Sequence, residues 1–112
     1  MRAARRTPLY YEPFMISRYD CAEIGVGVRA HKHSIIEPCH FTVIASGEVV
    51  VKLYDDDGNE IGCERYAAPS IIDYNDGKDR HHSIEATMPG TTFFNIPRAV
   101  SKKDEIVSYF EV

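Results

Sequence analysis

The strongest constraint on the fold is a succession of short segments with β-strand character, separated by turn signals. In residues 24–31, apolar residues alternate with glycine or polar residues, which is the period of two expected of a strand. Further segments of this type cover residues 41–45, 48–54, 61–66, 70–74, 82–86 and 91–96. Such short strands at turn spacings of roughly 8–12 residues, with almost no helix, predict an all-β sandwich or barrel.

Two glycines mark the turns in the middle of the chain. Residues 41–45 end at Ser46-Gly47, and residues 48–54 resume with a β-branched run, so we expect these two strands to form a hairpin. A second turn is expected at residues 55–59, where Gly58 can take a positive φ at little steric cost.

The length of 112 residues fits one domain, 1–112. We expect residues 1–13 to form an N-terminal arm or edge strand, residues 24–98 the barrel core, and residues 99–112 a C-terminal strand or short helix. Ser101 followed by Asp104 is typical of a helix start, whereas residues 105–112 are β-branched and aromatic. The strand is the preferred interpretation of this tail.

Charge and composition exclude several function classes. The 13 Lys and Arg residues against 17 Asp and Glu give a net charge of −4, which argues against nucleic-acid binding. No apolar stretch approaches the ~20 residues that a membrane span needs, and no apolar segment follows the first arginines as in a signal peptide. The three cysteines form no Cys-x-x-Cys, so we expect reduced thiols and a cytoplasmic protein.

The five histidines form two groups about fifty residues apart in the sequence. His31 and His33 are two residues apart, so on a strand they face the same side, and this face also carries Gly25 and Gly27. An isolated His-x-His is consistent with a half-exposed polar ladder that binds nothing. A second group containing His82 favours a transition-metal site.

The first histidine group resembles a motif of the small single-domain cupins, Gly-x5-His-x-His-x(3,4)-Glu-x6-Gly. The matching residues of this chain are Gly25, His31, His33 and Glu37. Gly47 then lies three residues later than the motif expects, and counting back from it places His40 at the position of the family's carboxylate. Because an insertion is easier to accommodate in a loop than in a strand, His40 is preferred and Glu37 is the alternative.

The second histidine group resembles the second cupin motif more weakly. The segment His82-Ser-Ile-Glu-Ala is similar to the outgoing strand of that motif, which implies that His82 is a ligand and that His81 points to the opposite face. The Pro-x-Gly of the motif is absent, and the turn is about two residues longer. Residues 93–98 resemble the strand that follows, so the resemblance covers residues 24–98.

The resemblance implies a cupin-like jelly-roll β-barrel, or double-stranded β-helix, that holds one divalent transition metal ion: Fe, Mn, Ni or Zn. The implied ligands are His31, His33, His40 and His82, with Glu37 as the alternative to His40 or as a nearby base. Three or four protein ligands on an octahedral ion leave positions for substrate.

The resemblance also implies two kinds of function, because the fold does not choose between them. The first is a metal-dependent enzyme of the dioxygenase or isomerase type that acts on a small polar organic molecule. The alternative is a non-catalytic ligand-binding or assembly barrel whose metal is structural or absent. A homodimer is expected in both cases, because Ile24, Val26 and Val28 face outward if the histidines face the cavity.

Overall fold

All regular structure in the described part of the chain is β-strand. The structure is a computed structural model that describes residues 1–11, 14–33, 41–73, 81–96 and 106–109, and it contains no helix within these ranges. This confirms the all-β prediction for this part of the chain. In chain order the strands are β1 (Arg2–Ala3), β2 (Arg5–Tyr11), β3 (Phe14–Cys21), β4 (Val26–His33), β5 (Phe41–Ser46), β6 (Glu48–Tyr54), β7 (Glu60–Ala67), β8 (Ser70–Asp73), β9 (His81–Ala86), β10 (Thr91–Ile96) and β11 (Ile106–Tyr109).

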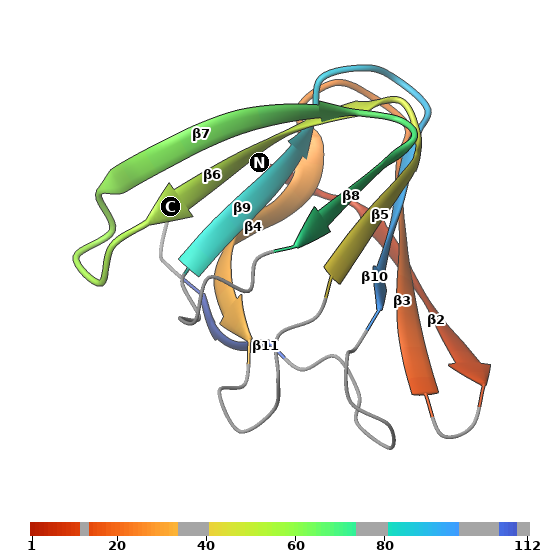
Figure 1. Cartoon of the computed structure of the whole chain (residues 1–112), viewed down its shortest axis with the longest axis horizontal. Coiled ribbons are helices and arrows are strands. Elements are labelled where there is room, and N and C mark those ends of the chain that lie inside the picture. The colour runs from red at the N-terminus through yellow and green to blue at the C-terminus, as the bar shows by residue number, and fades with distance from the viewer. Residues whose placement is uncertain (12–13, 34–40, 74–80, 97–105, 110–112) are drawn as a thin grey trace.

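The strands form two sheets that lie against each other (Figure 1). Sheet A has the order β1-β4-β9-β6-β7, and β11 also pairs with β4. Sheet B has the order β2-β3-β10-β5-β8. The short β1–β4 pairing is parallel, and the other ladders are antiparallel.

Strands β3 to β10 pair in the order of one long hairpin, in which the first strand pairs with the last and the two middle strands pair with each other. Successive pairs lie alternately in sheet A and in sheet B. The pairs β6–β7 and β4–β9 belong to sheet A, whereas β5–β8 and β3–β10 belong to sheet B. Two further ladders, β6–β9 and β5–β10, join these pairs side by side within each sheet. Strands that follow one another in the sequence therefore mostly lie in opposite sheets.

This arrangement corrects the expected hairpin between residues 41–45 and 48–54. Strand β5 lies in sheet B and β6 in sheet A, so the chain crosses between the sheets at Gly47. Gly47 has a φ of 79°, and a Cβ atom at this position would lie 2.1 Å from Oγ1 of Thr91. Glycine is required at this corner by both its backbone conformation and its contact with Thr91.

The expected turn at residues 55–59 does join two paired strands, β6 and β7. Oδ1 of Asp55 accepts hydrogen bonds from the backbone N–H groups of Asp57 and Asn59, at 3.0 and 2.8 Å. Gly58 takes a φ of 87°, as the sequence predicted. The aspartate side chain therefore stabilises the turn as an Asx motif.

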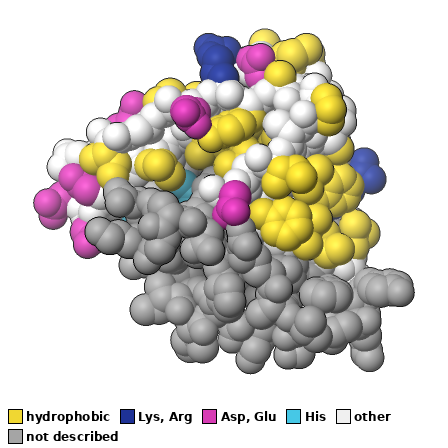
Figure 2. Space-filling view, in the orientation of Figure 1, with side chains coloured by type: hydrophobic (Ala, Val, Ile, Leu, Met, Phe, Trp, Pro, Cys, Tyr) yellow, Lys and Arg dark blue, Asp and Glu magenta, His cyan; other side chains and the backbone are white. Residues whose placement is uncertain are grey.

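The outer face of sheet B carries apolar side chains. Ile71, Val43 and Phe94 are cross-strand neighbours on β8, β5 and β10, and Ile71 is 66% exposed. In the space-filling view, hydrophobic side chains gather over β5 and β8 (Figure 2). The larger group of exposed hydrophobic side chains in this view thus lies over sheet B, although Ile61 on β7 of sheet A is also 50% exposed.

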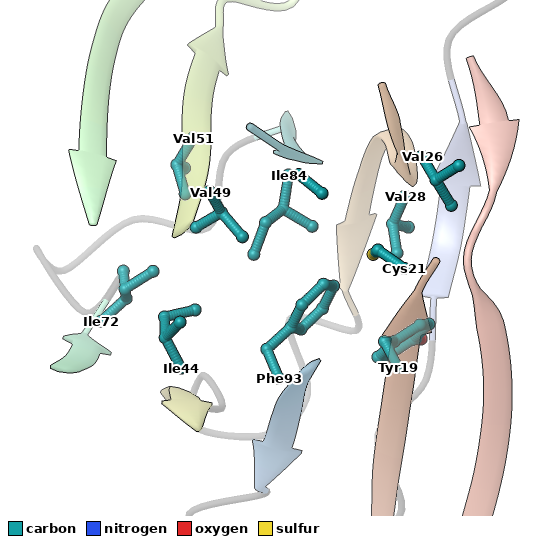
Figure 3. Close-up of a cluster of buried hydrophobic side chains, with 11 residues drawn as sticks. Tyr19, Cys21, Val26, Val28, Ile44, Val49, Val51, Ile72, Ile84 and Phe93 are labelled. Carbon is teal, nitrogen blue, oxygen red and sulfur yellow. The ribbon is translucent and has the colours of Figure 1, made fainter. Parts of the chain in front are cut away.

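The hydrophobic core lies between the sheets, and its buried members come from β3, β4, β5, β6, β8, β9 and β10 (Figure 3). Phe93 is fully buried and stacks on Tyr19, with 5.0 Å between the ring centroids. The buried members from sheet A are Val26, Val28, Val49, Val51, Ile84 and Ala86, and those from sheet B are Tyr19, Cys21, Ile44, Ile72 and Phe93.

Within the described residues the two sheets do not close into a barrel. No ladder joins an edge strand of sheet A to an edge strand of sheet B. The N-terminal strand β2 is an edge strand of sheet B, and β11 in the C-terminal segment pairs with β4. The expected barrel is therefore a pair of packed sheets with open edges.

Candidate metal centre

Strand β4 contains one extra residue that decides which way His31 faces. Val28 pairs with Ile84 and His31 with His82, so three residue steps on β4 match two steps on β9. On a regular strand His31 would face away from Val28, because side chains alternate between the two faces. The bulge cancels one step of this alternation, and both Val28 and His31 therefore face the interior.

The bulge overturns two expectations about β4. Val26 and Val28 are buried in the core and do not form an outward apolar strip, although Ile24 is 62% exposed. The reason given for a homodimer therefore no longer holds. Gly27 faces away from His31, and a Cβ atom at this position would lie 2.0 Å from the carbonyl oxygen of Ile84. Gly27 thus permits a close approach of β4 to β9, and it does not leave volume beside the histidine.

His31 and His82 form a cross-strand pair on the inner face of sheet A. Their side chains are 1% and 3% exposed, and their ring centroids are 4.4 Å apart with an angle of 58° between the ring planes. His82 shares its face with Ile84 and Ala86, which belong to the core. The structure therefore brings together one ligand candidate from each of the two histidine groups.

A backbone hydrogen bond fixes the orientation of His31. Its Nδ1 lies 2.6 Å from the carbonyl oxygen of Arg29, and a carbonyl only accepts, so Nδ1 carries the proton. In the neutral imidazole the lone pair is then on Nε2. Histidine ligands of metal ions are usually oriented by such a bond from the other ring nitrogen.

The remaining predicted ligands are not placed by the structure. The backbone of His33 lies at the end of β4 opposite Ile106, and its side chain is outside the described part. Glu37 and His40 lie in residues 34–40, also outside it. Among the residues that are described, no group of three or more His, Cys, Asp and Glu side chains is arranged to hold a metal ion.

His81 lies next to His82 but faces the opposite side of sheet A. It pairs with Tyr54 on β6, whereas His82 pairs with Leu53. The side chain of His81 is 8% exposed, so it is a packing residue and not a solvent-exposed one. The two neighbouring histidines therefore sit in different environments.

Sheet B contributes a row of three buried polar residues that the sequence did not single out. Ser17, Asn95 and Thr42 are cross-strand neighbours on β3, β10 and β5, and all are at most 5% exposed. Each lies two residues from a core residue on its strand (Tyr19, Phe93 and Ile44), so all three face the interior. Oγ1 of Thr42 donates a hydrogen bond to Oδ1 of Asn95 at 2.7 Å.

The polar residues of the two sheets lie toward the same end of the molecule. β4 and β10 run toward this end, and β3, β5 and β9 begin there (Figure 1). Ser17, Asn95 and Thr42 follow the core at this end of sheet B, as His31 and His82 do in sheet A. We call these five residues the inner polar layer. Polar residues at alternate strand positions look like a solvent-facing side in the sequence, and only the sheet pairing shows that they are buried together.

The buried thiol of Cys21 is not part of this layer. It lies in the apolar core, where burial, and to a lesser extent the charge of Asp20, raises the pKa of the thiol to about 11. Cys21 is therefore a packing residue of the hydrophobic core.

Comparisons with protein-family models, with curated proteins and with solved structures found no match to this chain. Within the described residues there is no helix of the length and apolarity that crossing a membrane requires.

Proposed function

We propose that this chain is a metal-binding domain of the cupin type, in which His31 and His82 are two ligands of one divalent transition metal ion. The observation that carries this proposal is the histidine pair itself, buried on the inner face with ring centroids 4.4 Å apart. Imidazole nitrogens suit Fe, Mn, Ni or Zn. The remaining ligands in this proposal are His33 and either His40 or Glu37.

The order of the strands supports the jelly-roll part of the proposal. The successive pairs β6–β7, β5–β8, β4–β9 and β3–β10 alternate between the two sheets, as in a long hairpin that has been rolled up. Eight strands in two facing sheets are typical of jelly rolls, including cupins. In this fold the ends of several strands surround the interior, which is where the inner polar layer lies.

The chain's own residues would prepare the site in two ways. The Arg29 carbonyl orients the His31 ring and sets its tautomer. The burial of both imidazoles keeps bulk water away from them, which strengthens electrostatic interactions within the site. A bound ion would supply Lewis acidity toward an oxygen of the ligand or water.

We propose a small polar organic molecule as the substrate, in a reaction of the dioxygenase or isomerase type. The alternative is a binding or assembly domain without catalysis. The two are separated by whether the ion keeps a position for an exchangeable ligand. Water-proton relaxation of Mn²⁺-loaded protein measures this directly, because only an ion with a bound exchanging water enhances relaxation.

Metal binding can be tested with three histidine variants and a metal-free preparation. We expect the wild-type chain to bind about one Zn²⁺ or Ni²⁺ ion, and His31→Ala and His82→Ala to weaken this binding by roughly 100-fold. His81→Gln is the matched control, because it alters the adjacent histidine on the opposite face of the sheet. The measurements are elemental analysis and isothermal titration, with far-ultraviolet circular dichroism as a check of folding.

Two results would overturn the metal proposal. One is a wild-type protein that binds neither Zn²⁺ nor Ni²⁺ at micromolar concentrations. The other is an equal loss of metal binding in His81→Gln and in the two inner-face variants, because the face of the sheet on which a histidine lies would then not affect metal binding.

A further inference from the structure

Arg6 has an unusual position for an arginine near the start of a chain. It pairs with Tyr19 across the β2–β3 ladder, so its side chain starts on the inner face of sheet B. Its Nε and Nη2 atoms lie 3.2 and 3.0 Å from Oγ of Ser17, a fully buried member of the inner polar layer. Because β2 is an edge strand, the guanidinium reaches the layer from the open side of the sheet.

The contact of Arg6 with a neutral hydroxyl contrasts with the other arginines of the N-terminal strands. Arg2, Arg5 and Arg18 each form an ion pair with a carboxylate, whereas Arg6 forms none with any residue that the structure describes. A guanidinium has five N–H donors in a fixed fork that matches a carboxylate. Two of these donors point to one oxygen of Ser17, and the fork has the capacity for further acceptors.

The charge balance around Arg6 favours an anion. The inner polar layer consists of two imidazoles, a serine, a threonine and an asparagine, and none of these five residues is a carboxylate. Oγ of Ser17 accepts both hydrogen bonds from Arg6, so its own hydroxyl proton can be donated to another acceptor.

We propose that the inner polar layer binds the carboxylate group of a small aliphatic organic acid, with Arg6 as its cationic partner and Ser17 as a hydroxyl donor beside it. This rests on the proposed function, since it places the ligand in the same interior as the histidine pair. It adds the charge of the ligand, the residues that recognise that charge, and an entry side at the β2 edge. Arg6 is exposed at this edge, so its guanidinium is accessible to a carboxylate from solvent.

The test uses three carboxylates (propionate, succinate and citrate) together with propionamide and succinamide as neutral partners of similar size. The Nε–H signal of Arg6 and the backbone amide of Ser17 are followed by NMR in uniformly labelled protein, with and without added Zn²⁺. We expect at least one of the carboxylates to shift both signals at millimolar concentration, and neither carboxamide to do so. Arg6→Gln should weaken the binding of that carboxylate by roughly 10- to 100-fold, because charge-assisted hydrogen bonds are lost.

Arg5→Gln is the matched control. It removes the same charge from the neighbouring residue, which pairs with Asp20 on the outer face of sheet B, so carboxylate binding should stay within about twofold of wild type. Arg6→Lys keeps the charge but loses the planar fork, and we expect an intermediate affinity.

The outcomes separate this inference from the metal proposal. Carboxylate binding that depends on Arg6 in protein that binds no metal would support the inference and contradict the proposed function. Metal binding through His31 and His82 without any shift of the Arg6 signal by the three carboxylates would overturn the inference alone. Equal shifts by acids and carboxamides, or equal effects of Arg5→Gln and Arg6→Gln, would also overturn it.

Discussion

The interior between the sheets has two halves with opposite chemistry, although the same strands build both. In one half, Tyr19, Phe93 and Ile44 face the valines and Ile84 of sheet A. Two residues further along its strands, sheet B presents Ser17, Asn95 and Thr42. Sheet A presents His82 two residues from Ile84, and His31 three residues from Val28 because of the bulge in β4. The hydrophobic core and the buried polar layer are therefore adjacent to each other along these strands.

The difference shows how a small all-β domain can combine stability with a binding site. Apolar burial contributes roughly 25 cal/mol per Å². Buried polar groups contribute little net stability and are costly when they lose a partner. We therefore expect the apolar half to stabilise the fold. In the polar half, replacing both partners of a hydrogen bond by apolar residues should change the free energy of unfolding little, but it should impair the proposed binding.

The largest effect is expected in the apolar half. Phe93→Ala removes a fully buried ring that stacks on Tyr19, and we expect it to lower the free energy of unfolding by about 3–5 kcal/mol. The control is Phe94→Ala, one residue along on the outer face, where the ring is half-buried and lies 5.8 Å from the Arg18 guanidinium carbon. Urea unfolding measures both, and equal losses would contradict the assignment of inner and outer faces.

A smaller effect is expected in the polar half. Thr42→Val removes the donor to Oδ1 of Asn95 and should cost about 1–2 kcal/mol in the same urea experiment. The double variant Thr42→Val/Asn95→Leu removes both partners, so its cost should be less than the sum of the two single changes. Strict additivity of the two changes would argue against a direct contact between these side chains.

The smallest effect is a pH dependence that arises in the apolar half. Burial raises the pKa of Cys21 from 9.0 to about 11, so the unfolded chain loses this proton at a lower pH than the folded chain. The stability that this group contributes is complete below pH 9.0 and is lost as the pH rises toward about 11. We expect a loss of about 1 kcal/mol over this interval, measured by urea unfolding at several pH values.

Cys21→Ala is the comparison that isolates the thiol. The pKa of Tyr66 is also raised, to about 12, chiefly by its hydrogen bond to Glu64, and it contributes a similar dependence at higher pH in both proteins. The wild type should therefore lose more stability than Cys21→Ala between pH 9.0 and about 11. Parallel curves for the two proteins would contradict the burial of this thiol.

The sequence predicted the strands well because alternation of apolar residues reports directly on the two faces of a strand. It did not predict the partners of the strands, since alternation in residues 41–45 and 48–54 is the same for a hairpin and for a crossing between sheets. The crossing depends on Gly47 and its contact with Thr91, two residues that are far apart in the sequence.

The proximity of two of the candidate ligands was expected from the sequence, although the structure changes the reason for it. His31 and His82 were expected together from the resemblance to the cupins, and they form a pair. Regular alternation would place His31 and Val28 on different faces of β4. Only the register of β4 against β9 reveals the bulge that turns His31 inward. Ser17, Thr42 and Asn95 were missed because a buried polar row has the same alternation as an exposed one.

The extra residue in β4 also has a genetic consequence. Deletion of one residue between Val28 and His31 would leave two residue steps, the regular spacing for side chains on one face, so that His31 would still face the interior opposite His82 without a bulge. The change would leave the number of histidines and the hydrophobic core residues as they are. A strand of this design can therefore accept the insertion or deletion of a single codon at the bulge while its histidine keeps facing the interior.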